Sequence, residues 1–370
     1  MGKGGGGFIL LSTIAFIFVL SVLVLVHEFG HFIIAKTLGV RVDVFSIGFG
    51  KKLFSCCKGD TEYRISLIPL GGYIKMAGDD PEQKREGKEW EFLSKPIAHR
   101  FAIIFAGPAF NYLLAFVLFS IVFFLGTGNL TTRIGEIKDG YPAQQAGLTS
   151  DDIVVAIDGQ KVEYWHQLSE IIHSKVQKKE VDFSIKRQGE LITLAIIPRV
   201  EKMKNILGQE VEIGLIGIGH SDELKVVRYG PVESILRGAQ QTANLTALTC
   251  TALFRMFTGQ MSLKESVTGP IGIFYITGKA AKMGFVYLLQ IMASLSVSLG
   301  IVNLFPVPVL DGGHLLFLFI EKIKGKPVSV KFQENAMRVG LTVLVTLMLL
   351  IFYSDFKRFE IFTKIFSFFK

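Results

Sequence analysis

Residues 27–31 read HEFGH, and they follow directly on residues 8–26, which contain no charged side chain. In a helix, residues four apart lie on one face, so His27 and His31 can bind the same metal ion. Glu28, one residue along, can then act on water at that metal. The apolar run is about 28 Å long as a helix, enough to cross the hydrocarbon of a bilayer. The stretch therefore predicts a zinc hydrolase site carried by a membrane helix.

The composition is that of a polytopic α-helical membrane protein with a soluble insert. The chain has 370 residues, of which 50% are hydrophobic and 19% charged, and its mean hydropathy is +0.44. This balance is typical of proteins that cross the membrane several times. The apolar core of the first span is too long for a signal peptide, so we expect it to stay in the protein. About four transmembrane helices are predicted, at residues 8–35, 101–125, 285–310 and 339–353, the last extended backwards from about residue 335.

The net charge of +8 does not indicate a nucleic-acid partner, because the basic residues gather in two loops. Residues 36–100 hold twelve Lys and Arg and residues 322–338 hold five, whereas only Lys3 precedes the first span. The positive-inside rule then predicts that both basic loops lie in the cytoplasm. The N-terminus and the long segment between the second and third spans are expected outside.

The pattern predicts four regions along the chain. The first carries two spans, the HEFGH motif and a cytoplasmic loop, and the second is soluble and extracytoplasmic. The third includes an amphipathic helix on the outer face, at about residues 231–259. The fourth carries the last two spans and a C-terminal tail. Their boundaries are predicted at residues 1–127, 128–225, 226–284 and 285–370.

The cytoplasmic loop contains strand-like segments at residues 44–54, 61–68 and 73–76, separated by glycines and a proline. These segments predict one or two β-hairpins that lie against the membrane or dip into it. An ordinary loop with short strands is equally compatible with the pattern.

The soluble insert alternates short strands with two short helices. A strand at 134–137 is followed by a helix that ends at Gly147, a strand at 153–157, a helix at 165–174 and a hairpin around Gly189. This order resembles a PDZ domain of the permuted bacterial protease type. One copy is found, which predicts a single inserted α+β domain.

A third metal ligand is predicted at Asp311, the only acidic residue between positions 285 and 320. An ionisable group in so apolar a window is costly unless it is paired or bound to metal. The first and third spans run in the same direction, so His27, His31 and Asp311 can meet at one depth. Two histidines and a carboxylate leave a fourth zinc position for water, as in catalytic sites, with Glu28 as general base. The alternatives are a buried histidine pair satisfied by other helices and a helix cap at Asp311.

Five pieces of the chain occur in the order found in one known family. They are HEFGH, IIFAGPAFN at 103–111, the PDZ-like insert, GPI at 269–271 and NLFPVPVLDGGH at 303–314. The chain closely resembles the site-2 protease family of intramembrane zinc metalloproteases, and within it the branch of the bacterial regulator-of-sigma-E proteases. It departs from the proteobacterial members of that branch in having a single PDZ domain in place of two.

The resemblance implies a zinc metalloendopeptidase that cleaves single-span transmembrane substrates in regulated intramembrane proteolysis. Such substrates are anti-sigma factors or signal-peptide-like segments, trimmed beforehand by another protease. The resemblance also implies Zn2+ as cofactor and a multi-pass protein of a bacterial inner or plasma membrane, with the active site towards the cytoplasm. It implies further that Asn303 holds the substrate backbone and that the hairpin around Gly48, Phe49 and Gly50 offers an edge strand.

Two other functions are compatible with parts of the sequence. A membrane-anchored PDZ scaffold with a non-catalytic metal site needs no general base, and Glu28 therefore favours the protease. A metal transporter needs a continuous polar path, and the second and fourth spans offer almost no polar residues.

Overall fold

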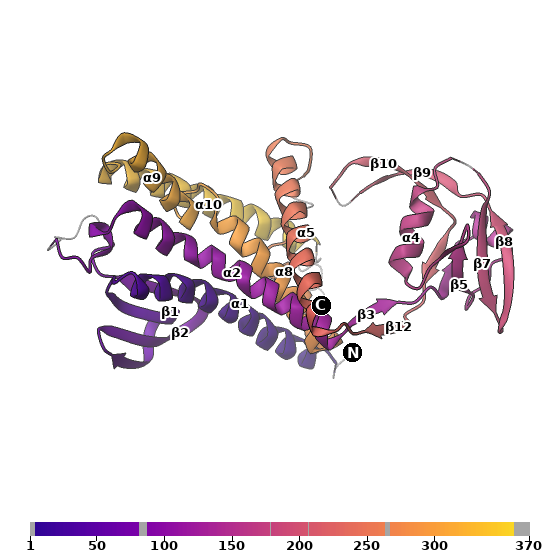
Figure 1. The fold of residues 1–370 in the computed structure, drawn as a ribbon, viewed down its shortest axis with the longest axis horizontal. Coiled ribbons are helices and arrows are strands. Elements are labelled where there is room, and N and C mark those ends of the chain that lie inside the picture. Colours follow the sequence, from indigo (N-terminus) through magenta and orange to yellow (C-terminus); the bar gives the residue numbers. More distant parts are fainter. Residues whose placement is uncertain (1–3, 81–86, 178, 206, 263–266, 359–370) are drawn as a thin grey trace, which may run out of the picture. The chain divides into compact units, whose positions relative to one another are not determined.

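The computed structural model describes residues 4–80, 87–177, 179–205, 207–262 and 267–358, and the chain divides into two compact units. The membrane unit comprises Met1–Val122, Pro231–Leu253 and Ser262–Lys370, and the insert comprises Phe123–Gly230 and Phe254–Met261 (Figure 1). Residues 359–370, which belong to the predicted tail, lie outside the described residues.

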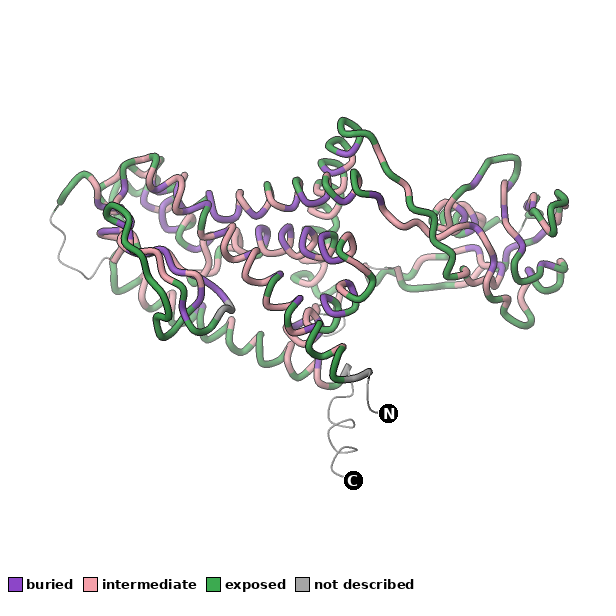
Figure 2. Tube along the Cα trace, turned by 90° about the horizontal axis from the view of Figure 1, so that it is seen from below, coloured by how far each residue is buried: buried purple, intermediate pink, exposed green. Residues whose placement is uncertain are grey.

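Within the described residues, four helices are long and apolar enough to cross a membrane, which confirms the predicted number of spans. The first turns of the N-terminal helix are largely exposed (Figure 2), as expected for turns that face lipid. A helix satisfies its backbone hydrogen bonds internally, so these apolar sequences are stable as helices in hydrocarbon. The four are α1 (Gly4–Thr37), α2 (Ile97–Leu125), α8 (Phe285–Asn303) and α10 (Val330–Arg358).

The third span is shorter than the predicted range of 285–310, because α8 ends at Asn303. Pro306 and Pro308 follow, and a proline can neither donate a backbone hydrogen bond nor tolerate a helical residue before it. The chain turns and starts a new helix, α9 (Asp311–Lys324), with Leu310 at its N-cap. The turn places Asp311 at the start of a helix. The fourth helix, residues 330–358, is longer than the predicted span from about 335 to 353, because hydropathy marks the lipid-facing part of a helix and not its ends.

Helices α1 and α2 approach closely beside the HEFGH motif. A Cβ on Gly30 would lie 2.5 Å from the carbonyl oxygen of Ala106, and one on Gly107 would lie 2.3 Å from Nε2 of His31. Small residues at such crossings let two membrane helices come into backbone contact. This contact brings α2 against both histidines.

The loop between the first two spans forms the predicted hairpin region from two long strands, β1 (Val42–Lys58) and β2 (Thr61–Met76). Residues 44–47 of β1 pair on one side with residues 72–75 and on the other side with residues 62–65. The two strands therefore fold back on themselves into one small sheet, which packs against α1. Residues 73–76 form a free edge of that sheet in the described part of the chain.

Two further helices precede the third span. The helix α5 (Pro231–Phe257) begins at a proline, which is well suited to the first helical position, and matches the predicted helix at 231–259. The helix α7 (Pro270–Met283) packs along α1 and α10. Asp355 of α10 is buried and accepts hydrogen bonds from the backbone amides of Gly269 and Gly272 at the start of α7. This carboxylate satisfies orphan amides at the helix N-terminus.

The insert has the predicted α+β, PDZ-like composition. A four-stranded sheet runs in the order β6-β5-β7-β8, and three further strand pairs are β4 with β11, β3 with β12 and β9 with β10. The apolar residues of the strands alternate, and those facing inwards form one core with α4. The elements are β3 (Thr127–Leu130), β4 (Ile134–Ile137), α3 (Pro142–Gln145), β5 (Ile153–Ile157), β6 (Gln160–Lys161), α4 (Trp165–Ser174), β7 (Val181–Arg187), β8 (Glu190–Ile196), β9 (Arg199–Lys204), β10 (Glu210–Leu215), β11 (Ile218–His220) and β12 (Leu224–Val227).

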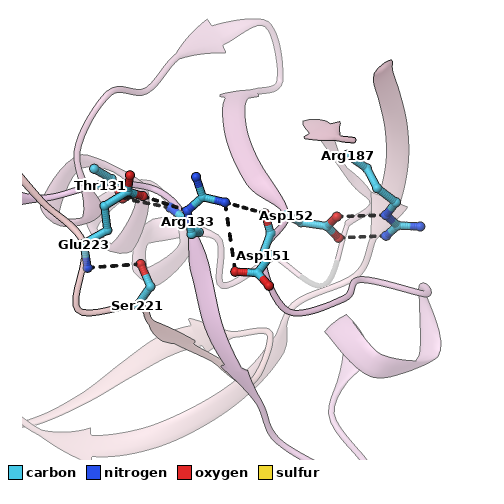
Figure 3. Close-up of polar contacts among 7 residues, drawn as sticks. All are labelled: Thr131, Arg133, Asp151, Asp152, Arg187, Ser221 and Glu223. Atoms are coloured by element: carbon cyan, nitrogen blue, oxygen red, sulfur yellow. Dashed lines mark hydrogen bonds and ion pairs between the residues drawn. The ribbon is translucent and has the colours of Figure 1, made fainter. Parts of the chain in front are cut away.

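Ion pairs tie the loops of the insert to its strands. Arg187 donates two hydrogen bonds to the carboxylate of Asp152, at 2.8 and 2.7 Å (Figure 3). Arg133 similarly donates to Glu223 at 2.7 Å. Asp152 also accepts the backbone amide of Thr149, so its carboxylate caps the turn before β5. These contacts stabilise the domain and do not converge on a cavity.

Candidate metal centre

The helical spacing of the HEFGH motif brings the two imidazoles of α1 together. The rings of His27 and His31 meet edge to face with centroids 4.8 Å apart, and their Nε2 atoms are 3.3 Å apart. Both residues are buried, with 8% and 7% of their surface exposed. Glu28 lies beside them and lines the same cavity.

Asp311 completes the cluster from the first turn of α9. Its Oδ2 lies 3.1 Å from Nε2 of His27, and its Oδ1 lies 3.5 Å from Nε2 of His31. Among the described residues these three form a group whose ligand atoms all lie within 4.8 Å of one another. The structure thus brings together the three residues that the sequence predicts as ligands, from helices nearly 300 positions apart in the chain.

The geometry of the cluster fits zinc. Ligand atoms at 2.0–2.2 Å around a tetrahedral ion lie about 3.3–3.6 Å apart, close to the spacing of the three groups here. Oδ2 of Asp311 is buried and accepts no hydrogen bond, although a nitrogen of His27 lies 3.1 Å away. A buried carboxylate oxygen without a hydrogen bond is costly, and a cation at the cluster would remove that cost.

The cluster opens into a cavity of about 590 Å³. Glu28 and Asn303 line it together with residues 73 and 74 of β2. A Cβ on Gly72 of the same strand would lie 3.4 Å from Cγ of Glu28, so the strand that forms the free edge faces the cavity. His314 also lines the cavity, but it does not belong to the cluster of three ligand atoms.

The residues expected to bind substrate lie in different places. Asn303 is close to the cluster, with its Nδ2 atom 3.4 Å from Nδ1 of His27. Gly48, Phe49 and Gly50 do not line the cavity. The ring of Phe49 stacks on that of Tyr73, at 6.1 Å between centroids, and so contacts the cavity only through Tyr73. The roles of all four residues stay predictions.

Several contacts of the two histidines were not predicted from the sequence. Nδ1 of His31 donates to the backbone oxygen of Ile103, at 2.8 Å, and the amide of Asn111 lies 3.2 Å from Nδ1 of His27. The sequence predicts an interhelical hydrogen bond for Asn111 because it is polar within a span, but it does not predict the partner. A backbone carbonyl leaves no signal in a sequence at all.

Comparison with known proteins matches residues 15–347 to the model of peptidase family M50. The regulator of sigma-E protease RseP of Escherichia coli (strain K12) is 34% identical over 447 aligned positions, which cover 93% of this chain and 98% of that protein. Protease RseP of Yersinia pestis is 33% identical, and the alignment covers 95% of this chain and 99% of that protein. A "Putative zinc metalloprotease" of Brucella suis biovar 1 is 34% identical over 360 positions, with 93% and 94% covered.

Among solved structures, the PDZ domain of the SdrC-like protein from Listeria innocua matches 25% of this chain and 96% of its own length. The sequence identity is 23% and the TM-score 0.20.

Proposed function

Because this chain belongs to peptidase family M50 and is a multi-pass membrane zinc metalloprotease, we propose that it cleaves the transmembrane segments of single-span proteins. The observation that carries the proposal is the convergence of His27, His31, Asp311 and Glu28 at one cavity between membrane helices and β2. A protease that acts on water-soluble substrates has no need of a site built into such helices.

In this proposal His27, His31 and Asp311 bind the zinc ion, and Glu28 is the general base and acid. Bound zinc supplies Lewis acidity, which polarises water and the scissile carbonyl group. Glu28 takes a proton from the attacking water and later delivers it to the leaving nitrogen. Asn303 is placed to donate from its amide to a substrate carbonyl near the cluster.

The substrate enters the site as an extended strand. A membrane helix hides its carbonyl groups in its own hydrogen bonds, so a protease must unwind it. The free edge at residues 73–76 borders the cavity, and an added strand there would present its backbone to Glu28. Gly48, Phe49 and Gly50 support this edge, because Phe49 stacks on Tyr73. If helix-breaking residues in the substrate span leave the cleavage rate unchanged, this binding mode is wrong.

The proposed orientation follows from the basic loops and is the one implied for a bacterial inner or plasma membrane. The insert then lies outside the cytoplasm and the metal centre towards the cytoplasm. Substrates would be anti-sigma-type or signal-peptide-like proteins, trimmed on the outer side by another protease. The region boundaries proposed above, at residues 127, 225 and 284, divide the chain accordingly.

The insert acts as a filter against untrimmed substrates. The alternative is that a groove between α4 and β10, which contact one another, captures the new C-terminus of a trimmed substrate. A Cβ on Gly214 of β10 would lie 2.5 Å from the carbonyl oxygens of both Ile172 and Lys175. The strand therefore lies directly against the negative end of α4, which disfavours a carboxylate at that point. This geometry supports the filter.

The decisive experiment incubates the purified protein in liposomes with a single-span anti-sigma-type substrate, with and without a zinc chelator. Cleavage within the span, lost with chelator and restored by added zinc, is the expected result. Zinc binding without cleavage of any trimmed substrate would instead support the alternative, a membrane-anchored PDZ scaffold with a non-catalytic metal site.

A further inference from the structure

The helix α2 provides none of the three ligands, yet it contacts both histidines and the helix that carries Asp311. We propose that α2 is the positioning element of the metal centre and that Asn111 and Arg100 are its positioning side chains. Residues 100, 103, 107 and 111 follow one another at helical spacing, so they lie along one face of α2. All four are buried. The inference rests on the proposed ligands His27, His31 and Asp311.

The first contact orients His31. Its Nδ1 atom lies 2.8 Å from the carbonyl oxygen of Ile103, and a carbonyl oxygen can only accept. Nδ1 therefore carries the proton, and Nε2 keeps its lone pair for the cluster. A hydrogen bond on the second ring nitrogen is the usual way in which a protein orients a metal-binding histidine.

The second contact orients His27 through Asn111. The Nδ2 atom of Asn111 is 3.2 Å from Nδ1 of His27, whereas its Oδ1 is buried and has no hydrogen-bond partner. A half-turn of the carboxamide exchanges these two atoms. Oδ1 then accepts from Nδ1–H of His27, which gives this oxygen a partner and leaves Nε2 of His27 for the metal. The backbone oxygen of Asn111 also accepts a 2.8 Å hydrogen bond from Ser296, but Asn111 lies inside α2, where the helix itself fixes the backbone without this bond.

The third contact fixes the helix that carries Asp311. Arg100 donates from both terminal nitrogens to the two carboxylate oxygens of Glu321, ten positions after Asp311 on α9. Both residues of the pair are less than 10% exposed. Such a two-pronged contact sets direction as well as distance. The N-terminal end of α9 packs directly against the preceding turn. A Cβ on Gly313 would lie 2.4 Å from the carbonyl oxygen of Val307.

A purely structural role would predict a different outcome from a positioning role. Loss of packing lowers the stability of the metal-free protein, while the affinity of the folded protein for zinc stays the same. Loss of positioning lowers zinc affinity even when the metal-free protein is as stable as before. The two quantities can be measured separately on the full chain.

The first experiment compares Asn111→Leu, Asn111→Asp and the control Ser296→Ala. The control removes a buried hydrogen bond to Asn111 but does not touch His27. Zinc dissociation constants come from chelator competition, the ligand field from the visible spectrum of the Co2+-loaded protein, and metal-free stability from thermal unfolding. We expect Asn111→Leu to weaken zinc binding about 10- to 100-fold and shift the Co2+ spectrum. Asn111→Asp keeps an acceptor and should bind zinc like the wild type, as should Ser296→Ala.

Three results would overturn the assignment of Asn111. One is an unchanged zinc affinity in a folded Asn111→Leu variant. Another is an Asn111→Asp variant as weak as Asn111→Leu, which would make Asn111 a donor. The third is an equal loss in Ser296→Ala. If the wild-type protein itself binds no zinc, the proposed function fails, and that result is distinct from all three.

The second experiment concerns Arg100 and Glu321. We expect Arg100→Glu and Glu321→Arg each to weaken zinc binding, and the double variant to recover affinity. The neutral double variant, Arg100→Gln with Glu321→Gln, serves if a single variant does not fold. A neutral double variant that folds and binds zinc as tightly as the wild type would overturn the role of this pair.

Discussion

The insert and the membrane unit differ in where their apolar and polar side chains lie. In the insert, the residues of the core are apolar, and Phe183 and Ile185 are fully buried. In the membrane unit, Ile9 and Leu349 are 60% and 61% exposed, whereas the polar residue Asn111 is completely buried. The charged side chains of the insert form pairs (Figure 3): Arg133 and Glu223 are partly exposed, whereas Asp152 is buried and paired with Arg187.

The difference teaches where to look for chemistry. Water drives apolar groups inwards, so a core such as that of the insert says little about function. Lipid accepts apolar groups, and a polar group inside a membrane helix bundle persists only when it is paired or has a function. Following the buried polar residues of the membrane unit leads directly to the cluster of His27, His31 and Asp311.

The largest expected effect tests whether the polar interior of the membrane unit is catalytic. Glu28→Gln should reduce peptide hydrolysis by about 100- to 10,000-fold, because the amide cannot take up a proton. Zinc should remain bound, since Glu28 is not one of the three clustered ligands. Single-turnover cleavage and zinc content by atomic absorption measure the two effects.

His27→Ala provides the comparison for that variant, because it should lose both zinc and activity. Equal zinc loss in the two variants would show that Glu28 is a ligand and not the general base.

The next prediction concerns the space that α2 leaves for the histidines. In Gly107→Ala the new Cβ would lie 2.3 Å from Nε2 of His31, so the imidazoles must move. Overpacking of this kind costs about 1–3 kcal/mol, equivalent to about 5- to 150-fold weaker zinc binding. The control is Gly6→Ala in α1, where the new Cβ has no neighbour within 4 Å. Equal zinc affinity in both variants would contradict the close approach at Gly107.

The comparison also predicts that the insert is dispensable for the metal centre. Replacing residues 128–225 with a short flexible linker should leave zinc content and the cleavage of trimmed substrates nearly unchanged. Untrimmed substrates should become cleavable, because the filter is gone. Zinc content and gel-based cleavage of one trimmed and one untrimmed substrate measure these outcomes, and selective loss of trimmed-substrate cleavage would favour capture of the C-terminus.

The smallest effect concerns the charged pairs of the insert. Burial by itself raises the pKa of Asp152, but hydrogen bonds from Arg187 and from the amide of Thr149 outweigh it and lower the pKa below its usual value. A depressed pKa adds stability above the unfolded-state pKa, near 3.9, and that stability is lost as the pH falls through the folded-state pKa. The free energy of unfolding of the insert should therefore decrease as the pH is lowered below about 5.

Asp152→Asn should remove most of that acid dependence, whereas Asp151→Asn, with a side chain 85% exposed, should retain it. Fluorescence of Trp165 in a Trp90→Phe background reports on the insert in the full chain. An unchanged acid dependence in Asp152→Asn would assign the effect to other groups.

Hydropathy and spacing predict the number of spans correctly, because crossing a bilayer requires a long apolar helix whatever its neighbours are. They predict the end of the third span less well. The window from 285 to 310 is apolar throughout, and the break after Asn303 depends on Pro306 and Pro308. Apolarity reports the surroundings of a segment, whereas the end of a helix depends on local backbone chemistry.

The four spans, the hairpin region, the PDZ-like insert and the three residues that cluster could all be predicted from the sequence. Each of these follows from a local pattern or from an ionisable group in an apolar segment. The contacts of Asn111, of the Ile103 carbonyl and of the pair Arg100–Glu321 became visible only in the folded structure. These contacts join residues 72 to 221 positions apart. No local pattern records them, because they depend on which faces of the helices meet.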